Sequence, residues 1–295
     1  MFKIGKLFHL THVVSNLDAV DKWYDDVFSV TRFYRGYEKL AGRDASLIAI
    51  ADVVMEPMMP ARQEKLQNES VKKFHDRFGQ HFHSIAWYVD DVEAISGELD
   101  KHGLRLFNIL GKTVKPPHGS FAIWTHPRET HGQLEFALAG NYTIDPRLQP
   151  AWSNAFWHER HPLGIQRASH ITVLVRDLPS AKRLYCDVLG GKLIHEEEIP
   201  NRKKSAFVAV GEDSVVELAQ PLSPSSAEGR DMEQNGEGIH ALVFKSADVA
   251  KAGKFLESKG LKPESDGPDS IALGKEQAFG MVVGFTRRAL PNDPR

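Results

Sequence analysis

The sequence is poor in cysteine, since Cys186 is the only one among 295 residues. One thiol cannot close an internal disulfide, and it cannot build a cluster of thiolate ligands around a metal. Cys186 stands in LYCDVLGG, a segment with the pattern of an amphipathic helix. We therefore expect it to pack against a core rather than to act as a nucleophile.

Long runs of charge and long apolar runs are also missing. The 37 Lys and Arg against 39 Asp and Glu leave a formal net charge of −2, and no run of like charge indicates a nucleic-acid-binding arm or an acidic tail. No stretch approaches the roughly 18 apolar residues of a membrane span, and the first residues lack a secretion signal. We expect a cytoplasmic protein with a small-molecule substrate and no nucleic-acid or membrane partner. The oligomeric state is open between a monomer and a homodimer.

What the chain does contain is an internal duplication. HLTHVVSNLDAVDKWYDDVFS, from His9, aligns without a gap with HITVLVRDLPSAKRLYCDVLG, from His170, at an offset of 161 residues. HSIAWYVDDVEAISGELDKHGLR, from His83, matches HALVFKSADVAKAGKFLESKGLK, from His240, at an offset of 157. Each half thus holds two segments of one type, and a repeat of this kind decides the architecture.

Each segment predicts a strand, a helix and then about three strands. HLTHVV and HSIAWYV are rich in β-branched and aromatic residues, as strands are. Asn16 follows the first and Asp90-Asp91 the second as candidate helix N-caps. Further strands are expected in DASLIAIADVVMEPM, SFAIWTHP, GQLEFALA, SAFVAVGEDSVVELAQP, SIALG and GMVVGFT. Four such units fill the chain. The expected domains are residues 1–140 and 167–290, joined by a linker at 141–166 that is rich in proline and tryptophan.

This fourfold βαβββ pattern, with histidine on the first strand of a unit and glutamate on the last, resembles the vicinal oxygen chelate superfamily. That superfamily includes glyoxalase I, methylmalonyl-CoA epimerase and the type I extradiol dioxygenases. SVKKFHDRFGQHFHSIAWYVDDVEAI and THPRETHGQLEF are similar to segments of the epimerase, whereas the four-unit layout resembles a two-domain extradiol dioxygenase. The resemblance implies an α+β fold of two domains. Each would be a curved mixed sheet that encloses a cleft, with the helices outside.

The resemblance also implies one divalent metal ion, Fe, Zn, Mn, Co or Ni, that chelates neighbouring oxygens of the substrate. Carried over by position, its ligands in the first half are His9, His83 and Glu135. The matching residues of the second half are His170, Glu217 and His240. When GMVVGFT is aligned with GQLEFAL, Val283 stands opposite Glu135, so we expect the second site to be degenerate.

Glu56 is the candidate fourth ligand of the first half. Aligning VVMEPMMP on ELAQPLSP through both prolines places Val53 opposite Glu217, whereas the constant offset of 161 residues places Glu56 there. We favour the proline alignment, because a strand end fixed by proline is harder to slide than a hairpin loop is to shorten. Three ligands would leave about three positions open on the metal, as in a non-haem Fe(II) site. A fourth would favour glyoxalase or epimerase chemistry.

The favoured function is a metal-dependent isomerisation or epimerisation, in which the metal stabilises an enediolate as a Lewis acid. His118, at a turn just before a strand, is the candidate acid or base. The alternative is an extradiol-type ring-cleaving dioxygenase that uses non-haem Fe(II). Against it, ring-cleaving relatives carry a tyrosine ahead of an Asp-Pro pair, where this chain has Ile123 and His126-Pro127. They also keep the metal in the carboxy-terminal half.

A second alternative is a metal-free binding protein whose cleft is lined by aromatic residues such as Trp87, Tyr88 and Trp124. The histidine and glutamate pattern of the first half speaks against it. Within FHLTHVV, only His9 aligns with a histidine of the second half. His12, three residues on in a strand, faces the opposite side of the sheet, so we expect it to be a packing residue.

Overall fold

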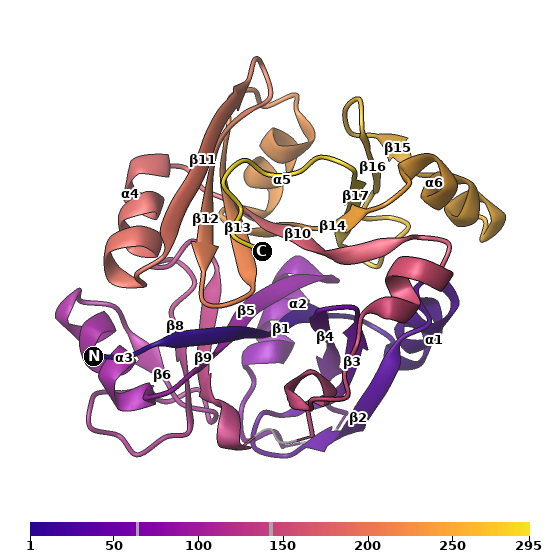
Figure 1. Cartoon of the computed structure of the whole chain (residues 1–295). Helices are drawn as coiled ribbons and strands as arrows, with labels where there is room; N and C mark the ends of the chain where they lie inside the picture. The colour runs from indigo at the N-terminus through magenta and orange to yellow at the C-terminus, as the bar shows by residue number, and fades with distance from the viewer. Residues whose placement is uncertain (63–64, 142–143) are drawn as a thin grey trace.

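The computed structural model describes residues 1–62, 65–141 and 144–295 (Figure 1). The first half contains β1 (Ile4–Val13), α1 (Leu17–Phe28), β2 (Thr31–Glu38), β3 (Arg43–Ile50), β4 (Val53–Pro60), α2 (Ser70–Phe78), β5 (His81–Val89), α3 (Val92–Lys101), β6 (Leu106–Phe107), β7 (Thr113–Val114), β8 (Ala122–Thr125) and β9 (Gln133–Leu138). Short helical turns follow as η1 (Ala139–Asn141), η2 (Pro146–Leu148) and η3 (Phe156–Arg160). Residues 142 and 143 of the expected linker lie outside the described residues.

The second half repeats this order. It contains β10 (Ile165–Leu174), α4 (Leu178–Lys182), η4 (Arg183–Val188), β11 (Lys192–Ile199), β12 (Lys203–Val210), β13 (Ser214–Pro221), α5 (Ala227–Asn235), β14 (Gly238–Ser246), α6 (Val249–Ser258), β15 (Glu264–Ser265), β16 (Ser270–Leu273) and β17 (Val282–Thr286). Cys186 lies in η4, half-buried against the apolar core, in the packing position expected of it.

The strands form two mixed sheets of matching topology. The order is β2-β3-β4-β1-β5-β9-β8-β6-β7 in the first sheet and β11-β12-β13-β10-β14-β17-β16-β15 in the second. In each, the opening strand lies at the centre, parallel to the last strand of its own unit and antiparallel to the first strand of the next. The α+β fold of two duplicated domains is therefore confirmed.

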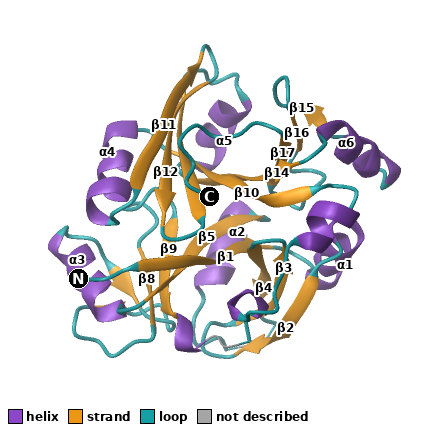
Figure 2. Cartoon of the chain, in the orientation of Figure 1, coloured by secondary structure: helices purple, strands orange, loops and turns teal. Residues whose placement is uncertain are grey.

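The helices follow from local signals in the sequence. Asn16 and Asp91 cap α1 and α3, because each side chain accepts a hydrogen bond from the backbone N–H three residues on. Figure 2 shows α1, α3, α4 and α6 at the periphery of the molecule. In contrast, α2 packs on the other face of its sheet, where Val71 and Phe74 join a small apolar cluster that includes Val13.

The two domains share one apolar core. Phe28, at the end of α1, lies 5.8 Å from Phe244 and 6.3 Å from Phe285 of the second domain, measured between ring centroids. The indole of Trp157, in η3, donates a hydrogen bond to the carbonyl of Phe28. The segment between the domains is therefore packed into this core, and burial on this scale fixes the two domains against each other.

A pair of symmetric hydrogen bonds also joins the domains. The backbone N–H of Ala168 donates to Asp52 Oδ1 and that of Leu7 donates to Asp213 Oδ1, both at 2.7 Å. The two aspartates stand in equivalent hairpin turns, between β3 and β4 and between β12 and β13. Burial raises the pKa of Asp52 to about 6, and burial also raises the pKa of Asp213.

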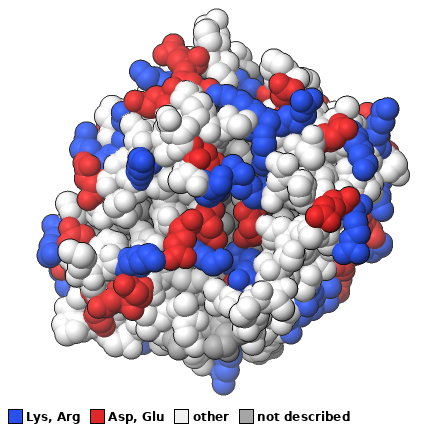
Figure 3. Space-filling view, in the orientation of Figure 1, with Lys and Arg blue, Asp and Glu red and all other residues white. Residues whose placement is uncertain are grey.

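The surface carries charges of both signs, as the composition predicts. Basic and acidic side chains are interspersed over the face of the molecule shown in Figure 3. Within the described ranges, no helix combines the length and the apolar character that a membrane span requires.

Candidate functional site

Two irregularities in the pairing of β1 with β5 aim side chains at one face of the first sheet. Leu10 pairs with Ile85 and His12 with Phe82, so that Thr11 faces two residues of β5, His83 and Ser84. Thr11 Oγ1 and Ser84 Oγ lie 2.7 Å apart, and His83 Nδ1 lies 3.3 Å from Ser84 Oγ. A second register shift, between Leu7 and His9, precedes His9. Bulges of this kind re-aim side chains beside functional sites.

On this face the structure brings together His9 from β1, Glu56 from β4 and Glu135 from β9. His9 Nε2 lies 3.2 Å from Glu56 Oε2 and 3.3 Å from Glu135 Oε2. Each of the three residues is only 2% exposed. Because one imidazole nitrogen faces two carboxylates in a buried space, these groups form a single electrostatic unit.

The preferred alignment of Val53 with Glu217 is wrong. In the parallel pairs of the two sheets, Thr11 stands opposite Glu56 and Thr172 opposite Glu217, which makes Glu56 the counterpart of Glu217. The eight-residue strands β4 and β13 match end to end. The proline alignment failed because strand pairing fixes the register. The difference in length between the two halves lies in the hairpin turn that precedes each of these strands.

The alignment of Val283 with Glu135 is also wrong, by one residue. Glu135 pairs with Ala86, and the corresponding pair in the second sheet is Gly284 with Val243. A slip of one residue turns a side chain to the other face of a sheet, and Val283 accordingly belongs to the apolar core. The second half still has no acid at this position.

The second-half residues do not converge as those of the first half do. His170 Nε2 lies 3.5 Å from Glu217 Oε2, but His240 turns away, with Nδ1 2.5 Å from Asp231 Oδ2. Lys203 Nζ lies 2.6 Å from Glu217 Oε1, where its ammonium holds the pKa of that carboxyl far below the usual range against the effect of burial. A lysine thus supplies the positive charge in this cluster.

Hydrogen bonds fix the carboxylates of the first-half cluster. Arg43 Nη2 lies 2.8 Å from Glu56 Oε1, and the indole Nε1 of Trp124 donates to Glu135 Oε2 at 2.8 Å. Burial raises the pKa of Glu56 despite Arg43 and His9. Burial would also raise the pKa of Glu135, but the combined effects of His9, Arg43 and Trp124 outweigh it and lower the pKa. The two carboxylates therefore differ in proton affinity.

The two histidines of the site differ as well. Burial would lower the pKa of His9, but the charges of Glu56 and Glu135 outweigh it and raise the pKa. Burial, helped by the charge of Arg43, lowers the pKa of His83 to about 3. His83 is therefore neutral at physiological pH, the form in which imidazole binds a metal.

The donor set fits a divalent metal. Neither ring nitrogen of His9 makes a well-aligned hydrogen bond among the described residues, although both are buried and Nε2 lies close to two carboxylates. Neighbouring ligand atoms around an octahedral ion at 2.0–2.1 Å stand about 3 Å apart, close to the spacing between His9 Nε2 and the two carboxylates. As they stand, no three or more histidine, cysteine or acidic side chains of the described ranges are placed so that they could hold a metal ion. The histidine that stands apart is His83, which contacts Ser84.

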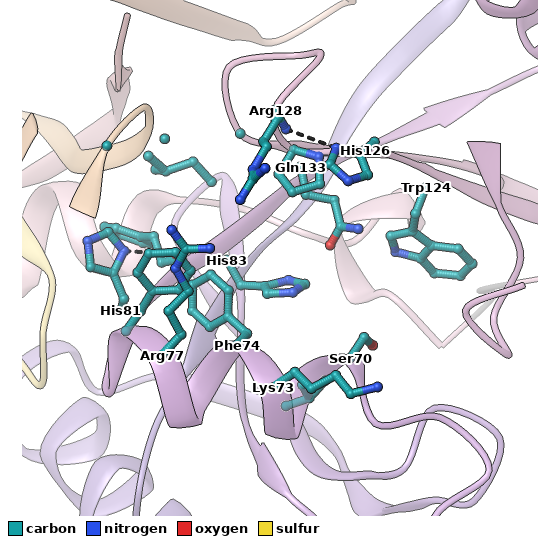
Figure 4. A pocket seen from close by; sticks show the side chains of 18 of the residues that line it. Ser70, Lys73, Phe74, Arg77, His81, His83, Trp124, His126, Arg128 and Gln133 are labelled. Atoms are coloured by element: carbon teal, nitrogen blue, oxygen red, sulfur yellow. Dashed lines mark hydrogen bonds between the residues drawn. The ribbon is translucent and has the colours of Figure 1, made fainter. Parts of the chain in front are cut away.

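A cavity of about 730 Å³ lies beside this cluster, between the two domains (Figure 4). His83, Arg43 and Trp124 line it, so the last two connect the cavity with the buried carboxylates to which they bond. The second domain supplies part of the wall through Leu174, Arg176, Asp231, Glu237 and Ile239. The second domain therefore shapes the site of the first, a role that its own sequence did not reveal.

His118 lies elsewhere. Its Nε2 is 2.9 Å from Ser96 Oγ on α3, and its backbone N–H donates to Glu93. It does not belong to the cavity wall. The turn before β8 thus directs His118 to a helix, which corrects its expected role as an acid or base of the site.

The two halves of the chain each match known proteins. Models of the Glyoxalase/Bleomycin resistance protein/Dioxygenase superfamily match residues 8–121 and 167–279. The chain belongs to this superfamily. It is 28% identical over 149 residues to the mitochondrial methylmalonyl-CoA epimerase of Mus musculus, a match that covers 50% of this chain and 79% of the epimerase. It is 26% identical over 117 residues to the ethylmalonyl-CoA/methylmalonyl-CoA epimerase of Cereibacter sphaeroides, which covers 39% of this chain and 87% of that protein.

Among solved structures, a mutant of the 4-hydroxymandelate synthase from Streptomyces coelicolor superposes with a TM-score of 0.68. The superposition covers 98% of this chain and 95% of the synthase at 11% sequence identity, and it shows a shared fold alone. The superfamily resemblance deduced from the repeats is thus confirmed. Each epimerase relative corresponds to about half of this chain, as the duplication requires.

Sequence reasoning named Trp124 only as an aromatic lining of a metal-free cleft, and it missed Arg43 and Asp231 as residues of the site. Arg43 and Trp124 bond to the two carboxylates, and His81 and Asp231 face the cavity from different domains. The sequence held one signal for Arg43. It stands at the start of β3 as Lys203 stands at the start of β12, so each half places a cation on the glutamate of the following strand.

Proposed function

We propose that the protein is an enzyme that moves a proton next to a carbonyl group, in an isomerisation or an epimerisation. In this proposal one divalent metal is held by His9, Glu56, His83 and Glu135. The observation that carries it is the contact of Glu56 with His9, which adds a second carboxylate to the donor set. A fourth ligand favours proton-transfer chemistry over the three-ligand arrangement that leaves room for oxygen.

The metal, when bound, supplies a Lewis acid that stabilises negative charge on two neighbouring oxygens of the substrate. The side chains would divide the remaining work. Glu56 would serve in turn as ligand and as proton acceptor, because Arg43 holds Oε1 and leaves Oε2 for both tasks. Burial raises the pKa of this carboxyl, as accepting a proton requires. The proton leaves the carbon next to the carbonyl and returns to the substrate, so that no further reactant is consumed.

Glu135 and His83 would hold the site in place during this transfer. The indole of Trp124 fixes the carboxylate of Glu135, and the low pKa of His83 keeps its ring neutral. With the apolar part of the cavity wall, these groups limit the access of water to the reacting carbon.

Deuterium exchange tests the proposal. Protein reconstituted with Co, Ni, Zn, Mn or Fe(II) would be incubated in D₂O with a panel of 2-hydroxy ketones, 2-oxoaldehyde adducts and malonyl thioesters. NMR would report loss of the proton next to the carbonyl, and an electrode would report oxygen uptake with catechols. We expect exchange without oxygen uptake, lost in Glu56→Gln and kept in Glu217→Gln, its counterpart in the second half.

The alternatives give different results. Oxygen consumption with a catechol by the Fe(II) form would support the ring-cleaving dioxygenase. A protein that binds none of the five metals would support the metal-free binding protein. Either result contradicts the proposed isomerase or epimerase.

A further inference from the structure

The acidic side chains of the cavity wall are already paired. Asp231 contacts His240 and Lys275, each at 2.5 Å. Glu237 Oε1 lies 3.0 Å from His131 Nδ1 and accepts the backbone N–H of Arg176 at 2.7 Å. Each acid of the wall therefore already has a basic partner, so it offers little to attract a cation.

Two arginines of the same wall are in the opposite situation. Arg77 is on α2 and Arg128 is in the loop between β8 and β9. Among the residues that the structure describes, neither guanidinium has a hydrogen bond or ion pair, and the nearest ring contact of Arg77 is Phe78, with 4.8 Å from Cζ to the ring centroid. In Figure 4 the two side chains extend into the cavity from different walls. Two unpaired forks of N–H donors thus border one space.

A large part of the wall of this cavity is apolar. Phe74, Phe107, Ile109 and Ile239 belong to it, as does the indole of Trp124. A bound molecule therefore meets apolar surface and two guanidinium groups in one cavity, together with His83 of the proposed metal site.

We propose that this cavity binds a substrate with an apolar part and an anionic group, a carboxylate or a phosphate. Arg77 and Arg128 hold that anion. This rests on the proposed function only in naming the molecule as the substrate. The planar guanidinium presents paired donors that match both anions, which makes such contacts specific as well as strong.

Calorimetric titration with three naphthalene compounds tests the subsite. The probes are 1-naphthoate, 1-naphthyl phosphate and the neutral 1-naphthamide, which share one ring system and differ in charge. We expect at least one anion to bind about tenfold or more tightly than the amide, since hydrogen bonds to a charged group are stronger than those between neutral groups. The anion that binds more tightly identifies the carboxylate or the phosphate as the group recognised.

Charge-matched variants separate the subsite from the net charge of the protein. In Arg77→Gln/Arg128→Gln the preference for the anion should vanish while the amide binds as before. The control is Lys72→Gln/Arg287→Gln, which removes two positive charges from exposed positions outside the cavity wall. Equal binding of all three probes to the wild type, or an anion preference kept by the arginine variant, would overturn the subsite. His9→Ala, which tests the metal site, should leave the preference intact, so the two proposals fail separately.

A different observation carries a second inference. The tripeptide Asp-Pro-Arg occurs twice, at residues 145–147 and 293–295. Arg147 donates from Nη2 to the carbonyl of Phe8 at 2.6 Å and from Nη1 to the carbonyl of Asp52 at 2.8 Å. Its guanidinium also binds the carboxylate of Asp145, and Arg147 is 7% exposed.

Arg295 repeats these contacts in the other domain. It donates to the carbonyl of Ser169 at 2.7 Å and to that of Asp213 at 2.9 Å, and it pairs with Asp293. Phe8 and Ser169 immediately precede His9 and His170. Each arginine therefore ties the residue before the strand histidine to the hairpin turn of its own domain.

We infer that Arg147 is a positioning residue for His9. The carbonyl of Phe8 belongs to the bulge that turns His9 toward the carboxylates, and a short charge-assisted hydrogen bond restricts that peptide group. Loss of the bond lets the bulge relax and moves the imidazole away from Glu56 and Glu135. Arg295 has the same structural role beside a site that lacks the second acid.

Arg147→Gln and Arg295→Gln form a matched pair for the test. Both should lower the thermal midpoint of unfolding, but only Arg147→Gln should weaken Co(II) binding, by about tenfold or more. Arg147→Lys, which keeps the charge, should recover part of the affinity and provides a second variant if the glutamine form does not fold. In metal-free protein labelled with ¹⁵N-histidine, the ring signals of His9 should shift in Arg147→Gln and stay in place in Arg295→Gln. Unchanged His9 signals in folded Arg147→Gln, or equal shifts in both variants, would overturn this role.

Discussion

Asp52 makes the stability of the protein depend on pH. Its carboxylate is enclosed at the domain interface, and burial, reinforced by the charge of Asp213, raises its pKa from the ordinary 3.8 to about 6 although Ala168 donates a hydrogen bond to it. The folded protein therefore keeps this proton at pH values at which the unfolded chain has lost it. The contribution of Asp52 to stability is complete below about pH 4 and is lost as the pH rises to about 6.

The magnitude follows from the shift. One pKa unit corresponds to about 1.36 kcal/mol, so the free energy of unfolding should fall by up to about 3 kcal/mol over this pH range because of Asp52. Asp52→Asn removes the charge and keeps an oxygen to accept the N–H of Ala168. At pH 7.5 we expect it to gain about 1–2 kcal/mol, since the neutral acceptor also makes a weaker hydrogen bond than the carboxylate.

Urea unfolding followed by tryptophan fluorescence at pH 4.5, 5.5, 6.5 and 7.5 would measure this. The difference in free energy of unfolding between Asp52→Asn and the wild type should grow from pH 4.5 to 6.5 and then stay constant. Asp52→Ala is the matched control, because it also removes the charge but leaves the N–H of Ala168 unpaired. It should be about 1–3 kcal/mol less stable than Asp52→Asn. If the wild type and Asp52→Asn show parallel pH profiles, Asp52 ionises as an ordinary carboxyl and the interface reasoning is wrong.

Three further expectations concern packing and turns. Gly211→Ala should lower the free energy of unfolding by about 1–3 kcal/mol, because φ at Gly211 is +66° and a Cβ would stand 2.1 Å from the carbonyl oxygen of Gly5. Gly253→Ala in α6 should be neutral or up to about 1 kcal/mol stabilising, because a Cβ there would meet only Ile271 Cδ1, at 3.5 Å. Urea unfolding in which Gly253→Ala is less stable than Gly211→Ala would refute this. Trp87→Phe should cost about 1 kcal/mol or more through loss of the 2.9 Å hydrogen bond to Ser214 Oγ across the domain interface, so an unchanged unfolding midpoint would speak against that bond. His118→Ala should lower the thermal midpoint while Co(II) affinity stays within about twofold of the wild type, and a large loss of affinity would return His118 to the site.

The fold could be predicted largely from the sequence because the duplication was visible in it. Histidine-led strands at offsets of 161 and 157 residues, followed by Asn16 and Asp91 as caps, defined the unit, and each cap forms as expected. Local patterns of this kind are set by neighbouring residues along the chain. They survive in the structure because packing agrees with them.

Register was less accessible from the sequence. The proline alignment placed Val53 opposite Glu217, where Glu56 lies in the structure. The alignment of GMVVGFT with GQLEFAL placed Val283 opposite Glu135, where Gly284 lies. Both errors arise because hydrogen bonds to neighbouring strands fix the register, and a single sequence does not reveal which strands are neighbours.

The cationic side chains that support the site could not be predicted from the sequence, for a related reason. Arg43 meets Glu56 across two antiparallel strands, and Arg147 reaches Phe8 over 139 residues of chain. Contacts between distant residues depend on the packed fold, whereas His9 and Glu135 could be proposed because the superfamily pattern carries their positions.

Metal content per chain tests the four-ligand site most directly. Wild type, Glu56→Gln/Glu135→Gln and Glu217→Gln would be reconstituted with Co(II), dialysed and analysed for metal and protein. A site built from His9, Glu56, His83 and Glu135 predicts about one equivalent in the wild type and in Glu217→Gln, and less than about a tenth of an equivalent in the double variant. Loss of metal in Glu217→Gln, or an unchanged content in a folded double variant, would place the metal elsewhere and contradict the site.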